Sequence, residues 1–337
     1  MSTSLKPTLA RLALGETLSV SEAEEAFGVI MDGQATPAQI GGMLMAMRTR
    51  GETVAELTGA VTALRRRMAR VEAPVGAIDV CGTGGDGAAS LNISTAVTFV
   101  LTACGVPVAK HGNKALSSRS GGADVLTALG IGIEPPPDRL AGILRQVGCV
   151  FLFAPRHHPA LRHAAPVRVE LGTRTIFNLT GPLANPASVA RQLMGVYDKK
   201  WLRPVAETLR DLGSEAAWVV HGGGMDELVL EGANDVVSLS NGIVHSFTLT
   251  AADAGLSSAP ASALQGGDAA YNATALLALL RGEEGAYRDT VLLNAAAALV
   301  MAGHVQTLPQ GVARAAQAID EGAALVVLER LKAACEN

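Results

Sequence analysis

Residues 79–96 read DVCGTGGDGAASLNISTA and join an apolar segment to a polar one through a run of glycines. The apolar lead, AIDVC at 77–81, predicts a β-strand, and NIST at 92–95 is typical of a helix start. Glycines let backbone N–H groups approach a ligand closely, and a helix N-terminus adds uncapped donors with partial positive charge. In an open α/β sheet, ligands bind beyond the carboxyl ends of the strands. The stretch therefore predicts a phosphate-binding loop.

The polar side chains of this stretch differ in what they offer an anion. Asn92, Ser94 and Thr95 can donate hydrogen bonds, and Ser94 can also bind magnesium. Asp86 only accepts hydrogen bonds and would repel phosphate, so we expect it to bind a ribose hydroxyl or to orient the loop. The stretch matches neither G-x-G-x-x-G nor G-x-x-x-x-G-K-[ST]. A tight strand-to-helix connection with an N-cap is the alternative.

A second donor-rich loop, KHGNKALSSRSGGAD at 110–124, directly follows another apolar segment. It contains Lys110, Lys114 and Arg119 together with a histidine, an amide, three serines and three glycines. Cations and amide donors at this density suit a multiply charged anion. A polar surface loop, the alternative, would not need so many donors beside a first phosphate-type loop. We therefore expect both loops to hold one ligand.

Two acidic residues, Asp226 and Glu227, lie in HGGGMDELVL at 221–230, at the end of a further predicted strand. Mg²⁺ prefers hard oxygen ligands beside a bound diphosphate, and the glycines allow both carboxylates to turn toward one cation. A solvated acidic pair is the common alternative for any Asp-Glu. Beside two phosphate-type loops, we favour a metal site.

A histidine cluster occupies HHPALRH at 157–163. A zinc site would need closer convergence and further ligands than His157, His158 and His163 provide. A substrate channel or a helix cap is the favoured interpretation.

Helical and strand patterns divide the chain in two. Three capping-box patterns predict helices in the first seventy residues: Ser21 with Glu24, Thr36 with Gln39, and Thr53 with Glu56. After Pro74 and Gly76, short apolar runs alternate with helical patterns, which implies βαβ units and a mostly parallel sheet. Asn241-Gly242 predicts a hairpin turn, and two long helical segments are expected after Gly267.

Composition narrows the class of protein. The formal net charge of -4 provides no basic surface for nucleic acid, and aromatic residues make up only 3%. The four cysteines form no C-x-x-C pair, which indicates reduced thiols. The N-terminus has no apolar signal-peptide block, and the longest apolar run, at 292–303, is too short for a bilayer and contains Asn294. We expect a soluble cytoplasmic protein that binds neither nucleic acid nor membrane.

Five segments in this order make the chain similar to the anthranilate phosphoribosyltransferases: GTGGD at 82–86, NIST at 92–95, KHGN at 110–113, FNLTGPLANP at 177–186 and MDEL at 225–228. The resemblance covers nearly the whole chain, including TPAQIGGMLMAMRTRGET at 36–53. It implies an α/β fold like that of nucleoside phosphorylases and phosphoribosyltransferases. A small N-terminal α-helical domain at 1–73, joined by helices from about 159–187, would accompany a large α/β domain at 74–337 with a mostly parallel central sheet. A homodimer through the helical domain is also implied.

The resemblance implies transfer of the phosphoribosyl group of phosphoribosyl pyrophosphate (PRPP) to the amine of anthranilate, in tryptophan biosynthesis. By similarity, PRPP would be held by Gly82, Gly85, Asp86, Ser90, Asn92, Ile93, Ser94, Thr95, Lys110, His111, Gly112, Asn113, Lys114, Ala115, Leu116, Ser117, Ser118 and Gly122. Anthranilate would be held by Gly82, Asn113 and Arg168, with His111, His158 and Pro182 shaping its path. Ser94, Asp226 and Glu227 would bind magnesium, as two Mg²⁺ ions that arrive with PRPP.

The expected catalytic residues are Lys110, His111 and Arg168. Lys110 would stabilise the departing pyrophosphate, Arg168 would place the amine, and His111 could take the amine proton after attack. Three positions depart from the residues usual in the family: Lys114 replaces Arg, Arg119 replaces Lys, and Gly122 replaces Ser or Ala. The first two departures keep the positive charge but change the geometry of the hydrogen-bond donors, and the third loses a possible hydroxyl. We therefore expect a lower affinity for PRPP, but we expect each of the three positions to keep its role.

Two alternative functions remain. A pyrimidine nucleoside phosphorylase shares this architecture and also attacks a ribose C1, but it would not need the loops and carboxylates for a magnesium pyrophosphate. A non-catalytic, nucleic-acid-binding relative would show a basic surface and eroded glycine and carboxylate motifs.

Overall fold

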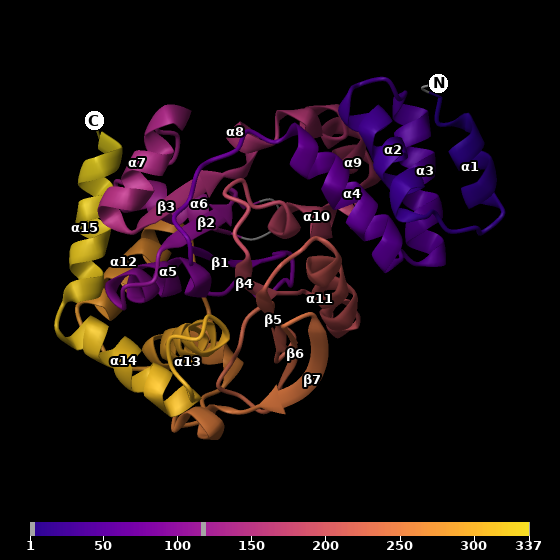
Figure 1. Ribbon diagram of the computed structural model, residues 1–337. Coiled ribbons are helices and arrows are strands. Elements are labelled where there is room, and N and C mark those ends of the chain that lie inside the picture. The colour runs from indigo at the N-terminus through magenta and orange to yellow at the C-terminus, as the bar shows by residue number, and fades with distance from the viewer. Residues whose placement is uncertain (1–3, 116–118, 337) are drawn as a thin grey trace.

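The computed structural model describes residues 4–115 and 119–336 and shows a helical lobe beside an α/β lobe (Figure 1). The helical lobe contains α1 (Lys6–Ala13), α2 (Val20–Met31), α3 (Pro37–Arg50) and α4 (Val54–Arg67). In it, α2 packs on α4 and α1 packs on α3. Two later helices join this lobe, since α9 (Ala165–Leu171) packs on α3 and α10 (Phe177–Leu183) packs on α4. Short helices α8 (Ala154–His157) and η1 (Pro159–His163) lead into them.

Capping side chains set the starts of the N-terminal helices. Two of the expected capping boxes are confirmed, Thr36 with Gln39 and Thr53 with Glu56. The third expectation, Ser21 with Glu24, is wrong, because the box is formed by Ser19 and Glu22. The segment SVSEAEE contains the pattern twice, and the earlier copy caps the helix because α2 already begins at Val20. Ser21 therefore lies inside the first turn.

A mixed sheet forms the centre of the α/β lobe. In the described residues it has seven strands in the order β3-β2-β1-β4-β5-β6-β7. The strands are β1 (Ile78–Gly82), β2 (Val108–Gly112), β3 (Cys149–Phe153), β4 (Arg191–Gly195), β5 (Ala216–Gly222), β6 (Asn234–Ser240) and β7 (Ile243–Leu249). The first five strands in this order, from β3 through β2, β1 and β4 to β5, run parallel to one another. Strand β6 pairs antiparallel with β5, and β7 pairs antiparallel with β6. The mostly parallel sheet is thus confirmed, as is the hairpin at Asn241 (φ 51) and Gly242 (φ 76).

The two faces of the sheet bury different helices. Helices α5 (Ile93–Ala103), α6 (Gly122–Ala128) and α7 (Pro137–Val147) share one hydrophobic core with the C-terminal helices. The second core combines Phe27 and Leu57 of the helical lobe with Phe177 of α10 and Met194 and Val219 of the sheet. Helix α11 (Leu202–Asp211) also belongs to this second core. The helical lobe is therefore packed onto the sheet through one continuous core.

The C-terminal part of the chain is more divided than the sequence suggested. Four helices, not two, follow Gly267 in the described residues: α12 (Ala269–Leu280), α13 (Ala286–Met301), α14 (Leu308–Asp320) and α15 (Ala323–Glu336). Glycines with positive φ stand two residues after the ends of α12 and α13 and directly before α15: Gly282 (φ 94), Gly303 (φ 77) and Gly322 (φ 73). A helix cannot continue through such a conformation. Every helix in the described ranges is too short or too polar to span a bilayer.

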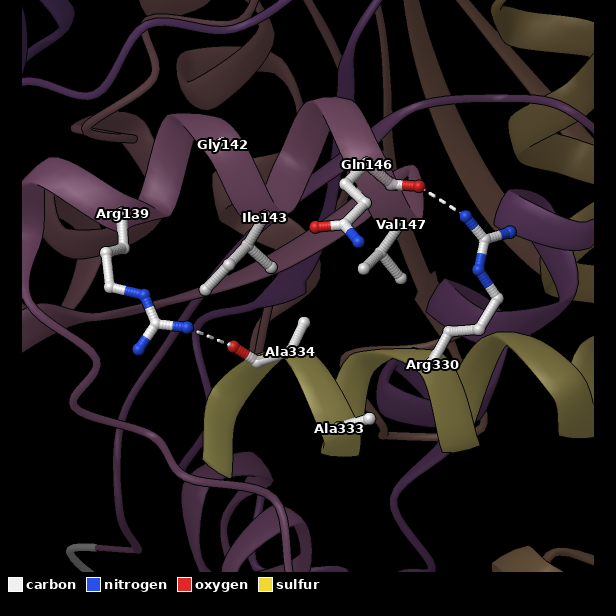
Figure 2. Close-up of a pocket in the computed structure, with 8 residues that line it drawn as sticks. All are labelled: Arg139, Gly142, Ile143, Gln146, Val147, Arg330, Ala333 and Ala334. Atoms are coloured by element: carbon white, nitrogen blue, oxygen red, sulfur yellow. Dashed lines mark hydrogen bonds between the residues drawn. The ribbon is translucent and has the colours of Figure 1, made fainter. Parts of the chain in front are cut away.

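A pocket of about 460 Å³ lies between α7 and α15 (Figure 2). Arg139 of α7 donates to the Ala334 carbonyl at 2.8 Å, and Arg330 of α15 donates to the Gln146 carbonyl. Each arginine thus crosses to the opposite helix. No described residue of the predicted site lines this pocket.

The close packing of α2 on α4 depends on Gly59. A Cβ at Gly59 would lie 2.4 Å from the Val20 carbonyl oxygen, whereas a Cβ at Gly142 of α7 would meet nothing within 4 Å. We expect Gly59→Ala to lower the free energy of unfolding by about 1–3 kcal/mol by forcing the helices apart. Gly142→Ala, the matched helical control, should raise it by up to about 1 kcal/mol. Urea unfolding measures both, and equal stabilities would contradict the close approach.

Candidate active site

The glycine-rich loop that follows β1 leads into α5, which begins at Ile93 with Asn92 as its N-cap. This confirms the predicted order of strand, loop and helix. Gly84 (φ 65) and Gly85 (φ 75) take left-handed conformations that other residues rarely adopt. At Gly82 a Cβ would lie 2.2 Å from Asp226 Oδ2. The glycines are required by local geometry, so their presence alone does not prove a ligand.

The two acidic residues of the β5–β6 connection lie against this loop. Gly84 N donates to Asp226 Oδ2 at 2.6 Å, and Ser94 N donates to Glu227 Oε1 at 3.3 Å. Asp86 accepts from the Ala88 and Asp226 backbone N–H groups at 3.0 and 3.4 Å. Of its two expected roles, Asp86 therefore performs the orientation of the loop in the structure.

Lys110, in the middle of β2, connects this strand to β1 and to the start of α5. Its side chain is buried, and its ammonium donates to the Val80 carbonyl at 2.6 Å and to Ser94 Oγ at 3.0 Å. An ammonium has three donors, so one remains for a ligand. Lys110, Ser94 and Glu227 are thus brought together at the N-terminus of α5.

The electrostatics of the acidic pair indicate a place for a cation. Burial, followed by repulsion from Asp86, raises the pKa of Asp226, and burial followed by repulsion from Asp226 raises the pKa of Glu227. A divalent cation would offset both costs. In the described part of the chain, no three His, Cys, Asp or Glu side chains form a metal site unaided. Ser94, Asp226 and Glu227 offer oxygen atoms of the kind that magnesium prefers, and such an ion would need further oxygen ligands from outside the protein.

The second loop, after β2, is closed by a residue that the sequence did not single out. Asp124 Oδ2 accepts from both Ala115 N and Gly121 N at 2.9 Å. Gly112 ends β2 where a Cβ would lie 2.7 Å from the Phe151 ring. Three expected ligands fall outside the described residues: Leu116, Ser117 and Ser118. The capping pattern of Gly121 with Asp124 was the available signal for this closure.

The three departures from the family pattern occupy different surroundings. Lys114 lies with its ammonium 5.9 Å from the Phe153 ring centroid, and Arg119 is exposed. At Gly122 a Cβ would lie 3.2 Å from Thr95 Oγ1, tighter than most contacts. Gly122 therefore allows α6 to begin close to α5, and a serine there would press on Thr95.

His111 and His158 form a buried pair. Their Nε2 atoms lie 3.2 Å apart, so one ring donates and the other accepts. Burial is the main reason that the pKa of His111 is lowered well below its ordinary value and that of His158 is lowered to about 4. Both rings are therefore neutral near pH 7. His157 instead donates from Nδ1 to the Ala69 carbonyl at 2.8 Å, which is a structural role.

The expected anthranilate residues lie on the helical side. Arg168 of α9 is partly buried, with its guanidinium carbon 5.5 Å from the Phe177 ring centroid. Burial lowers the pKa of Arg168, but a guanidinium stays charged. No hydrogen bond joins the Arg168 side chain to another residue that the structure describes, so its donors are available to a carboxylate. The Pro182 carbonyl accepts from Gln192 Nε2 at 2.8 Å, and Asn113 is exposed.

Other predicted residues contribute through the backbone. The Ile93 side chain is buried in the core, so only its main chain can face a ligand. Ser90 forms an antiparallel bridge with Gln265, and Leu91 N donates to the Leu264 carbonyl at 2.9 Å. The segment before α12 thus supports the glycine-rich loop.

Buried polar residues missed by the sequence analysis fix the backbone of the site. Asp79 accepts from His111 N at 3.1 Å and from Asn185 Nδ2 at 2.8 Å, and burial raises the pKa of Asp79 to about 6. Asn294 of α13 accepts from Leu228 N at 3.1 Å and donates to the Leu228 carbonyl at 2.8 Å. A polar residue inside an apolar run was the signal for Asp79 and for Asn294.

Comparisons with known proteins agree over nearly the whole chain. Residues 6–68 match the family described as "Glycosyl transferase family, helical bundle domain", and residues 75–325 match "Glycosyl transferase family, a/b domain". The chain is 59% identical to the anthranilate phosphoribosyltransferase of Mesorhizobium japonicum, over 97% of each chain. The crystal structure of that enzyme from Thermus thermophilus has a TM-score of 0.92 at 42% identity, covering 98% of this chain and 99% of that one. The Saccharomyces cerevisiae enzyme in complex with PRPP and Mg has a TM-score of 0.89 at 26% identity, covering 99% of both.

The neutral state of buried His158 predicts a dependence of stability on pH. The pKa of His158 is lowered from 6.5 to about 4. The contribution of neutral His158 to the free energy of unfolding is therefore fully present above pH 6.5 and is lost as pH falls toward 4. Between pH 7 and pH 5 this single group should remove about 2 kcal/mol from the free energy of unfolding. Urea unfolding should show that His158→Gln loses less stability over this interval than the unaltered protein. Equal losses would mean that His158 is not held neutral.

Proposed function

The chain belongs to the anthranilate phosphoribosyltransferase family, and we propose that it transfers the phosphoribosyl group of PRPP to the amine of anthranilate, releasing pyrophosphate, in tryptophan biosynthesis. One observation carries the proposal beyond the likeness. The glycine-rich loop, the N-terminus of α5 and the acidic pair converge on buried Lys110. This arrangement supplies donors for a diphosphate and oxygens for its cation.

Stabilisation of the leaving group is the main task of these residues. As the bond from C1 to pyrophosphate breaks, negative charge develops on the pyrophosphate and positive charge on the ribose. The remaining donor of Lys110, the hydroxyl and amide groups of Asn92, Ser94 and Thr95, and loop N–H groups would bind the developing anion. Donors fixed by buried hydrogen bonds need little reorganisation during the reaction.

Magnesium would accompany PRPP, as in the yeast complex. We propose Ser94, Asp226 and Glu227 as its protein ligands, with two ions per PRPP. When bound, magnesium neutralises charge on the phosphates and stabilises the departing pyrophosphate. The glycine-rich loop residues Gly82, Gly85 and Asp86, with Ser90, would shape the cavity around PRPP, as would Lys110–Ala115 and Gly122 of the second loop.

Positioning of the nucleophile would depend on the helical side. Arg168 would bind the carboxylate of anthranilate, aided by Asn113 and Gly82, and His158 and Pro182 would border its path. An aromatic amine is a neutral nucleophile at pH 7, so no prior deprotonation is needed. The protonated amine formed on attack is a strong acid, so even the weak base His111 could accept its proton. Held in place, such reactants gain as much as about 7 to 11 kcal/mol from proximity.

The alternatives find less support. The relatives compared above are named anthranilate phosphoribosyltransferases, with identities far higher than a shared architecture alone requires. A nucleoside phosphorylase would not need the acidic pair. A non-catalytic relative would not need a buried Lys110 beside Ser94 and the other groups that could bind a diphosphate.

We also propose a homodimer through the helical lobe. Leu14 of the α1–α2 connection and Val169 of α9 are 80% and 82% exposed, and both lie on this lobe. Exposed apolar side chains of this size are suited to a protein interface. A cytoplasmic location remains part of the proposal, supported by four free cysteines.

The function is tested by the fluorescence of anthranilate. We expect the signal to decay only when the protein, PRPP and Mg²⁺ are all present, because the product forms only from the complete mixture. Stopped-flow or steady-state fluorimetry measures the decay. If the folded protein leaves the signal unchanged, nucleoside phosphorolysis becomes the function to test.

The metal assignment is checked in the same assay. Glu227→Gln keeps an acceptor for Ser94 N but removes a charge, so half-maximal activity should require a higher Mg²⁺ concentration. An unaltered Mg²⁺ titration would discard Glu227 as a ligand.

Arg168 should determine the affinity for anthranilate. We expect Arg168→Ala to raise the KM for anthranilate by about tenfold or more, as for loss of a charged hydrogen bond, and to change the KM for PRPP far less. Arg162→Ala, which removes an exposed charge nearby on η1, is the control and should change neither. Equal effects of Arg168→Ala on both substrates would refute the assigned role.

A further inference from the structure

The side chain and the backbone of Asn92 are held by residues from helices near the C-terminus. The Asn92 side-chain Oδ1 accepts from Asn272 Nδ2 of α12 at 2.8 Å, and the Asn92 backbone carbonyl accepts from the Tyr287 hydroxyl of α13 at 3.1 Å. Its Nδ2 donates to the Ser120 carbonyl of the second loop at 3.4 Å. Asn92 is therefore fixed from three elements at the point where both anion-binding loops meet.

The orientation of Asn272 determines that of Asn92. Asn272 is buried, and its Oδ1 accepts from Gly267 N at 2.8 Å. A backbone N–H can only donate, so this contact leaves no freedom to exchange the oxygen and nitrogen of the Asn272 amide. Its Nδ2 must then face Asn92, which must present its own Oδ1 in return.

The consequence for a ligand follows from the geometry of an amide. With Oδ1 turned to Asn272, the Nδ2 of Asn92 points toward the second loop. One of its two hydrogens binds the Ser120 carbonyl, and the other is left for an anionic oxygen. The reverse orientation would turn a carbonyl oxygen toward the phosphates, which repels them. One buried amide thus decides whether Asn92 attracts or repels the substrate.

We propose that Asn272 is a positioning residue for PRPP, acting by orienting the side-chain amide of Asn92, and that Tyr287 supports it by fixing the Asn92 backbone from which that amide projects. This rests on the proposed function, in which Asn92 binds PRPP. Neither residue touches the reacting atoms. Their effect is confined to the affinity for one of the two substrates.

Asn272→Asp inverts the decisive hydrogen bond while keeping an acceptor for Gly267 N. The new carboxylate would accept a hydrogen bond from Asn92 Nδ2. The Asn92 amide would then be reversed, with its Oδ1 turned toward the phosphates. We expect the KM for PRPP to rise by about tenfold or more, as for a lost hydrogen bond to a charged group, with the KM for anthranilate within about twofold. If the unaltered protein shows no transfer, the proposed function fails. If it is active and Asn272→Asp leaves the KM for PRPP unchanged, the inference alone fails.

A double-variant cycle separates orientation from the added charge. In an Asn92→Ala background there is no amide to orient, so Asn272→Asp should raise the KM for PRPP by less than about twofold. The same rise in both backgrounds would show that the new charge acts directly, and would overturn the proposal.

Tyr287→Phe provides a neutral second variant should Asn272→Asp fail to fold. It removes only the hydroxyl that donates to the Asn92 backbone carbonyl and so loosens the backbone that carries the oriented amide. We expect a rise of about threefold in the KM for PRPP, with kcat and the KM for anthranilate unchanged. A rise in both KM values, or in neither, would refute the role of this pair.

Discussion

The close approach of Asp226 to the ends of two neighbouring strands is the constraint on which the site depends. Gly82 ends β1 and Gly195 ends β4, and a Cβ at either would collide with Asp226, at 2.2 Å and 1.5 Å from its atoms. Because both strand ends lack side chains, the β5–β6 connection can lie over them. The carboxylate then reaches Gly84 N at 2.6 Å. A single larger residue at either glycine would displace the acidic pair and open the loop.

The same site depends on a core that crosses from the helical lobe to the sheet. Phe27 and Leu57 are buried in one cluster with Met194 and Val219, so the lobe that carries Arg168 is fixed relative to the strands that carry Lys110. The proposed transfer between two substrates would require such a fixed relation, because misplacement by about 1 Å is costly in rate. Apolar side chains outside the site therefore hold its two halves in a fixed arrangement.

Features with a local signal could be predicted from the sequence, and features formed by distant residues could not. The glycine-rich loop, the strands and the Asn241 hairpin depend on neighbouring residues, so their patterns sufficed. Ser21 was misassigned because SVSEAEE contains the capping pattern twice. Asn272 and Asn294 were missed because each acts on a residue far away in the sequence, Asn272 on the Asn92 side chain and Asn294 on the Leu228 backbone. Asn294 was noticed only as an interruption of an apolar run. The pairing of His111 with His158 likewise required the fold.

The bond between Asn92 and Asn272 joins residues that are 180 positions apart. A ribosome releases Asn92 long before it has synthesised Asn272, Tyr287 or Asn294, and long-range contacts of this kind form late in folding. The loops near the start of the sheet therefore emerge without the supports that hold them. A nascent chain acquires the complete site only when its last third has left the ribosome, so a chain that terminates early carries the loops but not the binding site.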